Sequence, residues 1–107
     1  MKIVNRGFLI VRHRQPYFDW CKQFDAEMHF NEEDGLEPNI YLIEDDFMEI
    51  EPIIKANYKK IFYNELDAVT DEDDTYPEIT EENFHAWFYI EEGTSTFDAL
   101  SSDIERY

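Results

Sequence analysis

The sequence predicts an α+β fold, or a small α/β fold, with one layer of about three mixed strands and two to three helices packed on it. Aromatic residues make up 17% of the 107 residues, which is typical of a folded core rather than of a disordered acidic chain. Strand-like and helix-like patterns follow each other in the order β-α-β-α-α-β. A chain of this length predicts a single domain over residues 1–107.

The first strand and the first helix are expected in the N-terminal quarter of the chain. Residues 7–11, Gly-Phe-Leu-Ile-Val, lack polar alternation, as in a strand that is covered on both faces. Pro16 suits the first position of a helix, and we expect this helix over residues 16–26. Its apolar stripe consists of Tyr17, Trp20, Cys21, Phe24 and Met28. The acidic residues 31–38 then predict a loop with its sharpest bend at Asp34-Gly35.

The second strand and the longest helix follow this loop. Residues 40–43, Ile-Tyr-Leu-Ile, predict a buried strand, and its connection to the first strand through a helix predicts a parallel pair with a right-handed crossover. The next helix should begin near Glu51, because Pro52 is tolerated only in a first turn. Its apolar stripe is Ile53, Ile54, Tyr58, Ile61, Phe62 and Leu66, whereas Lys55, Lys59 and Glu65 lie off this stripe.

The C-terminal third predicts a loop, a short helix and a last strand. Residues 67–79 read as a loop, and Thr80 is a suitable cap for a short helix that buries Phe84, Trp87 and Phe88. Residues 89–100 are β-branched and aromatic and predict the third strand, with Gly93 as a bulge or bend. We expect residues 101–107 to be frayed.

The charge of the chain excludes two classes of partner. The formal net charge is −17, and 25 of the 26 acidic residues fall in residues 25–107, against four of the nine basic ones. Such a surface repels nucleic acid and anionic lipid, so we expect no direct nucleic-acid binding and no membrane binding. The acids either keep the protein soluble or steer it toward a basic partner.

The single cysteine indicates a reducing compartment. Cys21 has no partner in the chain for a disulfide, which favours a cytoplasmic protein over a secreted one. The apolar run at residues 8–11 is too short for a signal peptide or a membrane span. Because Cys21 lies on the apolar stripe of the first helix, we expect it to pack in the core rather than to act as a nucleophile.

One acidic segment has the spacing of a calcium loop. Asp71, Asp73, Thr75 and Glu82 occupy positions 1, 3, 5 and 12 of a twelve-residue window between two predicted helices. Position 6 is Tyr76 instead of the glycine that makes the sharp turn of an EF-hand. A solvated acidic loop is therefore favoured over a calcium site.

Arg12 and Arg14 are the other candidate binding residues. They share one face of the first strand by alternation, and they predict either an anion site or ion pairs with the many carboxylates of the chain. The second interpretation is favoured, since acidic partners are abundant. No catalytic residue is assigned: the sequence has no glycine-rich phosphate loop, no Gly-x-Ser-x-Gly and no Cys-x-x-Cys, and its three histidines lack metal-ligand spacing.

The chain also resembles a group of small, acidic, uncharacterised bacterial proteins. The resemblance lies in Arg-Gly-Phe-x-Ile-Val-Arg at residues 6–12, Gln-Pro-x-x-Asp-Trp at 15–20, Tyr-Leu-Ile at 41–43 and Trp-Phe at 87–88. It covers most of the chain and departs near the end, where this sequence has an extra residue and Gly93. The resemblance implies one small domain and no particular activity.

These observations favour a non-enzymatic protein-interaction module whose acidic surface engages a basic protein. One alternative is a calcium- or metal-responsive domain that uses residues 71–82. Another is a small enzyme that uses an acid in an aromatic-lined pocket. No cofactor is expected.

Overall fold

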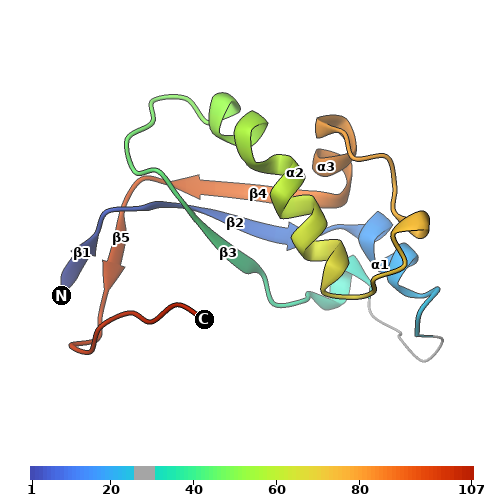
Figure 1. Cartoon of the computed structure of the whole chain (residues 1–107), viewed down its shortest axis with the longest axis horizontal. Helices are drawn as coiled ribbons and strands as arrows, with labels where there is room; N and C mark the ends of the chain where they lie inside the picture. The colour runs from blue at the N-terminus through green and yellow to red at the C-terminus, as the bar shows by residue number, and fades with distance from the viewer. Residues whose placement is uncertain (26–30) are drawn as a thin grey trace.

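The computed structural model describes residues 1–25 and 31–107 and has an α+β architecture (Figure 1). In this part of the chain the helices are α1 (Gln15–Cys21), α2 (Glu51–Asp67) and α3 (Glu81–Trp87), with short 3₁₀ turns η1 (Glu32–Asp34) and η2 (Asp73–Thr75). The strands are β1 (Lys2–Val4), β2 (Gly7–His13), β3 (Asn39–Ile43), β4 (Phe88–Gly93) and β5 (Thr96–Asp98).

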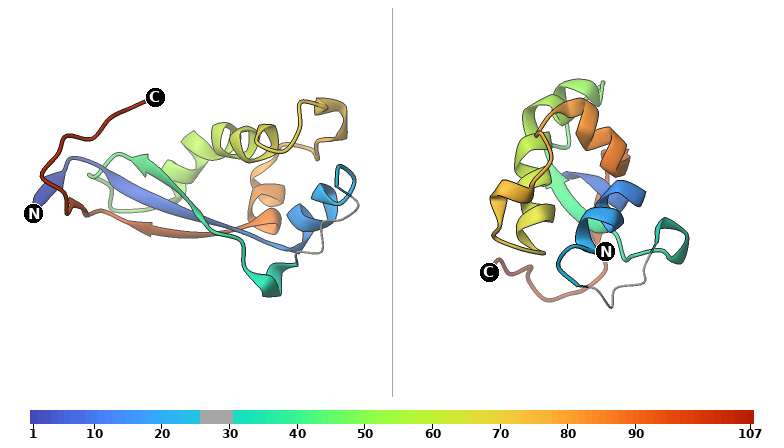
Figure 2. Two further views of the ribbon diagram at one scale, coloured as in Figure 1. Left: turned by 90° about the horizontal axis from the view of Figure 1, so that it is seen from below. Right: turned by 90° about the vertical axis from the view of Figure 1, so that its right-hand side faces the viewer.

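The strands form two small antiparallel sheets. The larger sheet has the order β3-β2-β4, and β1 pairs with β5 in the smaller one. Helices α2 and α3 lie over one face of the larger sheet, and α1 lies at the end of β2 (Figure 2). The opposite face of this sheet has no helix among the described residues.

The predicted parallel pair within a single mixed sheet is wrong. Strands β2 and β3 are antiparallel, with Phe8 opposite Leu42 and Ile10 opposite Ile40. A parallel pair needs a connection that returns the chain along the whole sheet, but α1 has only seven residues, about 10 Å of helix at 1.5 Å per residue. The chain therefore turns at the end of β2 and re-enters the sheet from that same end.

The strand predicted over residues 89–100 is interrupted. Val4 pairs with Thr96 and Phe8 pairs with Gly93. Between these two pairs, the three residues 5–7 therefore lie opposite only the two residues 94–95. This unequal count breaks the hydrogen-bond ladder and separates β5 from β4. Strand β1 was not predicted, because three residues carry too little pattern to identify a strand.

Other local predictions are confirmed. Helix α2 begins at Glu51 with Pro52 in its first turn, and the Thr80 hydroxyl accepts a hydrogen bond of 3.1 Å from the backbone N–H of Asn83 at the start of α3. Gly35 has a φ of 70°, which fits the predicted bend.

Helix α1 ends at Cys21, earlier than predicted, and Met28 lies outside the described residues.

The core lies between the larger sheet and the helices and is rich in rings. Phe18, Phe62, Phe84 and Phe88 are each at most 1% exposed, and Phe88 contacts both Phe62 and Phe84 with ring centroids 5.4 Å apart. Cys21 is buried as predicted, and burial raises the pKa of its thiol to about 11. Residues 101–107 are exposed and belong to no helix or strand.

Two glycines of the larger sheet should respond differently to substitution by alanine. A Cβ atom at Gly7 would lie 2.7 Å from the carbonyl oxygen of Gly93 and 2.8 Å from that of Glu44, so the backbone must move. A Cβ atom at Gly93 meets the ring of Phe8, which is half-buried and can rotate toward solvent. We expect Gly7→Ala to lower the free energy of unfolding by about 2–3 kcal/mol and Gly93→Ala by about 1 kcal/mol in urea titrations. Equal effects would contradict this packing of Gly7.

Candidate functional site

The most buried charged residue of the described chain is Glu65, which is 1% exposed. It belongs to the last turns of α2 and was expected off the apolar stripe, so this expectation is wrong. Its spacing of four residues from Ile61 and three from Phe62 places it on the face of the helix that packs against the sheet. This spacing indicated that Glu65 lies on the buried face, but its acidic side chain led to the opposite prediction.

Hydrogen bonds from both neighbouring strands satisfy the Glu65 carboxylate. His13 Nε2 of β2 lies 2.6 Å from Oε1, and Asn39 Nδ2 of β3 lies 3.0 Å from Oε1 and 2.8 Å from Oε2. The Tyr41 hydroxyl of β3 donates to Oε2. The Tyr17 hydroxyl of α1 donates to the backbone carbonyl of Glu65 at 3.1 Å. One residue of α2 is thus bonded to β2, β3 and α1; we call this set the Glu65 cluster.

The cluster favours an ionised Glu65 among neutral tyrosines. Burial alone raises the pKa of Glu65, but the hydrogen bonds from His13, Tyr41 and Asn39 outweigh it, and the pKa is lowered. Burial raises the pKa of Tyr17 and of Tyr41, and the nearby carboxylate adds to both effects. His13 Nδ1 is buried without a hydrogen-bond partner in the described chain, so the contact of Nε2 with Glu65 is the one hydrogen bond of this ring there.

The geometry of the Glu65 cluster suits structure rather than catalysis. His13 and Glu65 are 8% and 1% exposed, so neither group faces a substrate. Both carboxylate oxygens already accept hydrogen bonds. A general base needs a lone pair within reach of a substrate proton, and Glu65 offers none. The cluster instead fixes the position of α2 on the sheet.

The four residues of the predicted calcium loop are distributed over separate elements. Asp71 follows α2, Asp73 and Thr75 belong to η2, and Glu82 lies in the first turn of α3. The Thr75 hydroxyl donates to the carbonyl of Glu72 at 2.7 Å. Within residues 1–25 and 31–107, no group of three or more His, Cys, Asp or Glu side chains is placed to hold a metal ion. Calcium binding stays a prediction without support from this geometry.

Aromatic side chains tie the acidic loop to the helices. Trp20 Nε1 of α1 donates to the carbonyl of Thr75 at 3.2 Å. The Tyr76 hydroxyl lies 2.6 Å from Oδ1 of Asp67 and 2.7 Å from the carbonyl of Thr70. Desolvation and the hydrogen bond to Asp67 raise the pKa of Tyr76 to about 12. The conformation of this loop is therefore explained without a bound cation.

Arg12 and Arg14 both engage residues of the chain. Arg12 Nε lies 3.2 Å from Oε1 of Glu91, the exposed ion pair expected from the acidic composition. Arg14 lies beyond the end of β2, where its Nη1 donates to the carbonyl of His85 at 2.8 Å and its guanidinium stacks 4.4 Å from the centroid of Tyr89. The two guanidinium groups are thus occupied by different kinds of partner, a carboxylate and an aromatic ring.

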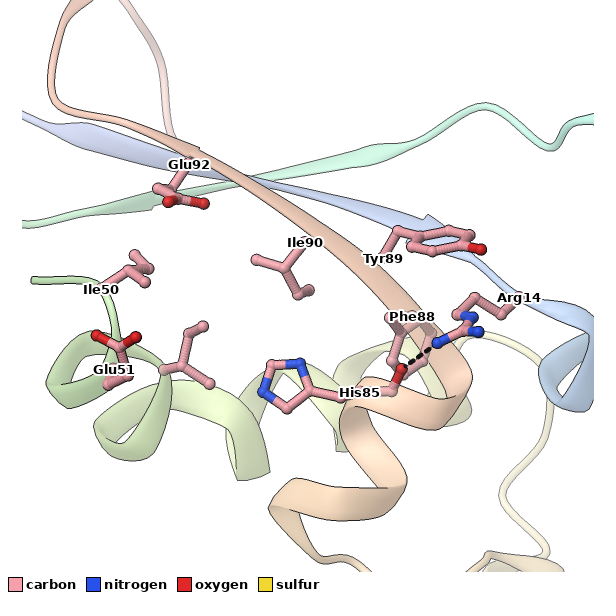
Figure 3. Close-up of a pocket in the computed structure, with 9 residues that line it drawn as sticks. Arg14, Ile50, Glu51, His85, Phe88, Tyr89, Ile90 and Glu92 are labelled. Atoms are coloured by element: carbon pink, nitrogen blue, oxygen red, sulfur yellow. Dashed lines mark hydrogen bonds between the residues drawn. The ribbon is translucent and has the colours of Figure 1, made fainter.

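A cleft of about 380 Å³ opens between α2 and β4 (Figure 3). We call it the α2–β4 cleft. Figure 3 places Glu51 and Glu92 toward one end of it and Arg14 at the other. Apolar side chains of both elements, among them Ile54 of α2 and Ile90 of β4, also line the cleft. Its lining residues are Arg14, Ile50, Glu51, Ile54, His85, Phe88, Tyr89, Ile90 and Glu92.

The helix-free face of the larger sheet carries exposed apolar side chains. Alternation along the strands and the observed register bring five of them to one surface, which we call the apolar sheet face. Ile40 is 64% exposed, Leu42 49% and Tyr89 50%, and Phe8 and Ile10 are half-buried beside them. Arg12 lies opposite Tyr89 and Glu91 lies opposite Ile10, so the Arg12–Glu91 ion pair lies between Tyr89 and the other four residues. The apolar sheet face thus consists of Phe8, Ile10, Ile40, Leu42 and Tyr89.

A hollow beside α1 has the aromatic lining expected of the enzyme alternative. Trp20 and Trp87 line it, and Asp19 is its one titratable residue. Asp19 Oδ1 accepts a hydrogen bond of 2.9 Å from Gln15. Acid–base catalysis by carboxyl groups needs two groups in different environments, and this hollow provides one.

Comparisons with protein-family models, with curated proteins and with solved structures find no match to this chain. The resemblance to small acidic bacterial proteins therefore stays a prediction. In the described part of the chain, no helix has the length and apolar character needed to cross a membrane.

Replacing Glu65 by glutamine should change stability and its dependence on pH. A lowered pKa in the folded state stabilises the protein above the unfolded value of about 4.3, and this stabilisation is lost as the pH falls through the folded value. We expect Glu65→Gln to lower the free energy of unfolding at pH 7 by about 2 kcal/mol and to weaken its decline below about pH 4.5.

The control is Glu105→Gln, which removes one carboxylate from the exposed tail. Urea unfolding of both variants between pH 7 and pH 3 measures the effect. If the free energy of unfolding of the two variants depended on pH in the same way, this would contradict the stabilising role of the ionised Glu65.

Proposed function

We propose that this protein is a non-enzymatic binding module that engages a basic protein through its apolar sheet face. The observation that carries this proposal is the exposure of Ile40 and Leu42 next to Phe8 and Ile10, on a sheet face without a covering helix in the described chain. Contiguous exposed apolar surface bordered by charge is typical of protein-interaction sites.

The composition of this surface supports protein binding over substrate binding. Phe8, Ile10, Ile40 and Leu42 form its apolar centre, and the exposed Arg12–Glu91 pair lies beside this centre on the side of β4. Interfaces commonly have an apolar centre and a polar rim, with aromatic residues enriched among the anchors. A face of a sheet is also open rather than concave, whereas small-molecule sites are enclosed.

The charge of the chain favours a basic partner over a second copy of the same chain. Exposed acidic residues flank β3 on both sides. Glu37 precedes the strand, and Glu44, Asp45 and Asp46 follow it. With a net charge of −17, two copies repel each other, whereas a cationic surface is attracted and steered.

The Glu65 cluster supports this function indirectly. Side chains alternate along β3, so the hydrogen bonds of Asn39 and Tyr41 to Glu65 direct Ile40 and Leu42 to the opposite face. A shift of the strand by one residue would exchange these two sets. The buried carboxylate thus holds the apolar side chains in an exposed position.

The proposal predicts capture of a basic protein that depends on this face and on salt. Immobilised protein is incubated with lysate at low and at moderate salt, and retained proteins are identified by mass spectrometry. The double variant Ile40→Glu/Leu42→Glu should reduce retention of the basic protein at least tenfold, because it places charge in an apolar contact. Added salt should weaken retention by the unmodified protein.

The matched control is Met48→Glu/Ile104→Glu, which adds the same charge at exposed positions outside the face. It should retain the partner like the unmodified protein. Equal loss in both double variants would count against the apolar sheet face as the contact surface, and salt-independent retention would count against charge-led binding.

A further inference from the structure

Strand β4 has an unpaired outer edge in the described chain. In the larger sheet β2 is central, and β4 pairs with β2 on one side only. An edge strand presents backbone N–H and C=O groups that can pair with an additional strand. Proteins often protect such an edge with proline, charged side chains or a covering loop. Strand β4 (Phe-Tyr-Ile-Glu-Glu-Gly) has no proline, and its two charged residues are both acidic, so they disfavour an acidic added strand and not a basic one.

The α2–β4 cleft lies on the helix-covered side of this strand. Phe88, Ile90 and Glu92 alternate toward α2 and line the cleft, together with Tyr89 at its Arg14 end, whereas Glu91 pairs with Arg12 on the other face. The side chains of a strand added beside β4 would alternate between the two faces of the sheet in the same way. Every second side chain of the added strand would therefore point into the cleft.

The chemistry of the cleft fits a long cationic side chain. Ile50, Ile54 and Ile90 provide apolar surface for an aliphatic stem, and Glu51 and Glu92 lie toward one end of it (Figure 3). In the described residues neither carboxylate has an ion-pair partner. Lysine and arginine bury their stems on apolar surface and leave the charge at the tip, which matches this arrangement.

The charge at the opposite end of the cleft determines which end favours a cationic side chain. Arg14 lies there, held by the carbonyl of His85 and the ring of Tyr89. Its fixed positive charge disfavours a basic side chain at the start of β4. The favoured position for a cation is therefore beside the end of β4, near Glu92.

We propose that the outer edge of β4 binds an extended basic segment of a partner protein by strand addition, with a lysine or arginine side chain of that segment in the α2–β4 cleft. Its stem packs on Ile54 and Ile90, and its charge lies between Glu51 and Glu92. Backbone pairing provides affinity and the cleft provides selectivity, as in other strand-addition complexes. This site shares only Tyr89 with the apolar sheet face. Glu91 and Glu92, one on each face of this edge, disfavour pairing with β4 of a second copy.

Isoleucine-methyl NMR of the full chain separates the two surfaces in one experiment. Ile50, Ile54 and Ile90 report on the cleft, and Ile10 and Ile40 report on the apolar sheet face. The probe is the peptide acetyl-Thr-Val-Lys-Val-Thr-amide. A second peptide with norleucine in place of lysine keeps the stem and removes the charge.

We expect the lysine peptide to shift the methyl signals of Ile50, Ile54 and Ile90 in a saturable manner and to leave Ile10 and Ile40 unchanged. The double variant Glu51→Gln/Glu92→Gln should weaken binding about tenfold, the size expected for two partly exposed ion pairs. Asp103→Asn/Glu105→Gln makes the same charge change in the exposed tail and should leave the affinity unchanged. A lysine peptide with N-methylated backbone amides should also bind weakly.

The inference is overturned if the lysine peptide causes no shift at millimolar concentration, or if the norleucine peptide binds equally well. It is also overturned if only Ile10 and Ile40 shift, which would place the peptide on the apolar sheet face. Failure at the cleft leaves the proposed function intact, because that function is tested on the other face of the sheet.

Discussion

The buried carboxylate of Glu65 connects the parts of this small domain. Its hydrogen bonds reach His13 on β2 and both Asn39 and Tyr41 on β3, and its backbone carbonyl holds Tyr17 of α1. Placing an anion in a protein interior is unfavourable unless hydrogen bonds compensate for the lost water. The arrangement is therefore demanding: each of these partners must be in place for the helix to pack on the sheet.

This requirement also determines which surfaces remain free. With Asn39 and Tyr41 turned inward, Ile40 and Leu42 face outward and form the apolar sheet face with Phe8, Ile10 and Tyr89. Because α2 covers the opposite face, its N-terminal turn lies near the end of β4 and completes the α2–β4 cleft. One interior interaction thus positions two candidate contact surfaces, both of which suit a protein partner.

Local signals in the sequence predicted local structure well. Pro52 and the apolar stripe located α2, and Thr80 located the cap of α3, because helix ends depend on neighbouring residues. The antiparallel pairing of β2 and β3 was missed because it depends on where α1 leads the chain, which no short pattern encodes. The division between β4 and β5 was missed because it arises from pairing with β1, far away in the sequence.

The candidate site was predictable only in part. The exposed ion pair of Arg12 followed from the excess of acids, and Glu91 is the partner the structure provides. Glu65 was assigned to the solvent side by its charge, although its spacing from Ile61 and Phe62 indicated the buried face. The hydrogen-bond donors that compensate for its burial lie 24 to 52 residues away in sequence, so only the folded chain reveals them. The apolar sheet face was hidden for a related reason, since a run of apolar residues does not reveal that one face of its strand is uncovered.

A double-mutant cycle between Glu65 and Tyr41 tests the central role of the buried carboxylate most directly. Glu65→Met, Tyr41→Phe and the double variant are compared with the unmodified protein by urea unfolding at pH 7. We predict a coupling of about 1–3 kcal/mol, because each single change removes the hydrogen bond between the two side chains and leaves the other polar group in place. Effects that add to within about 0.3 kcal/mol would show that the two groups do not depend on each other and would contradict this account.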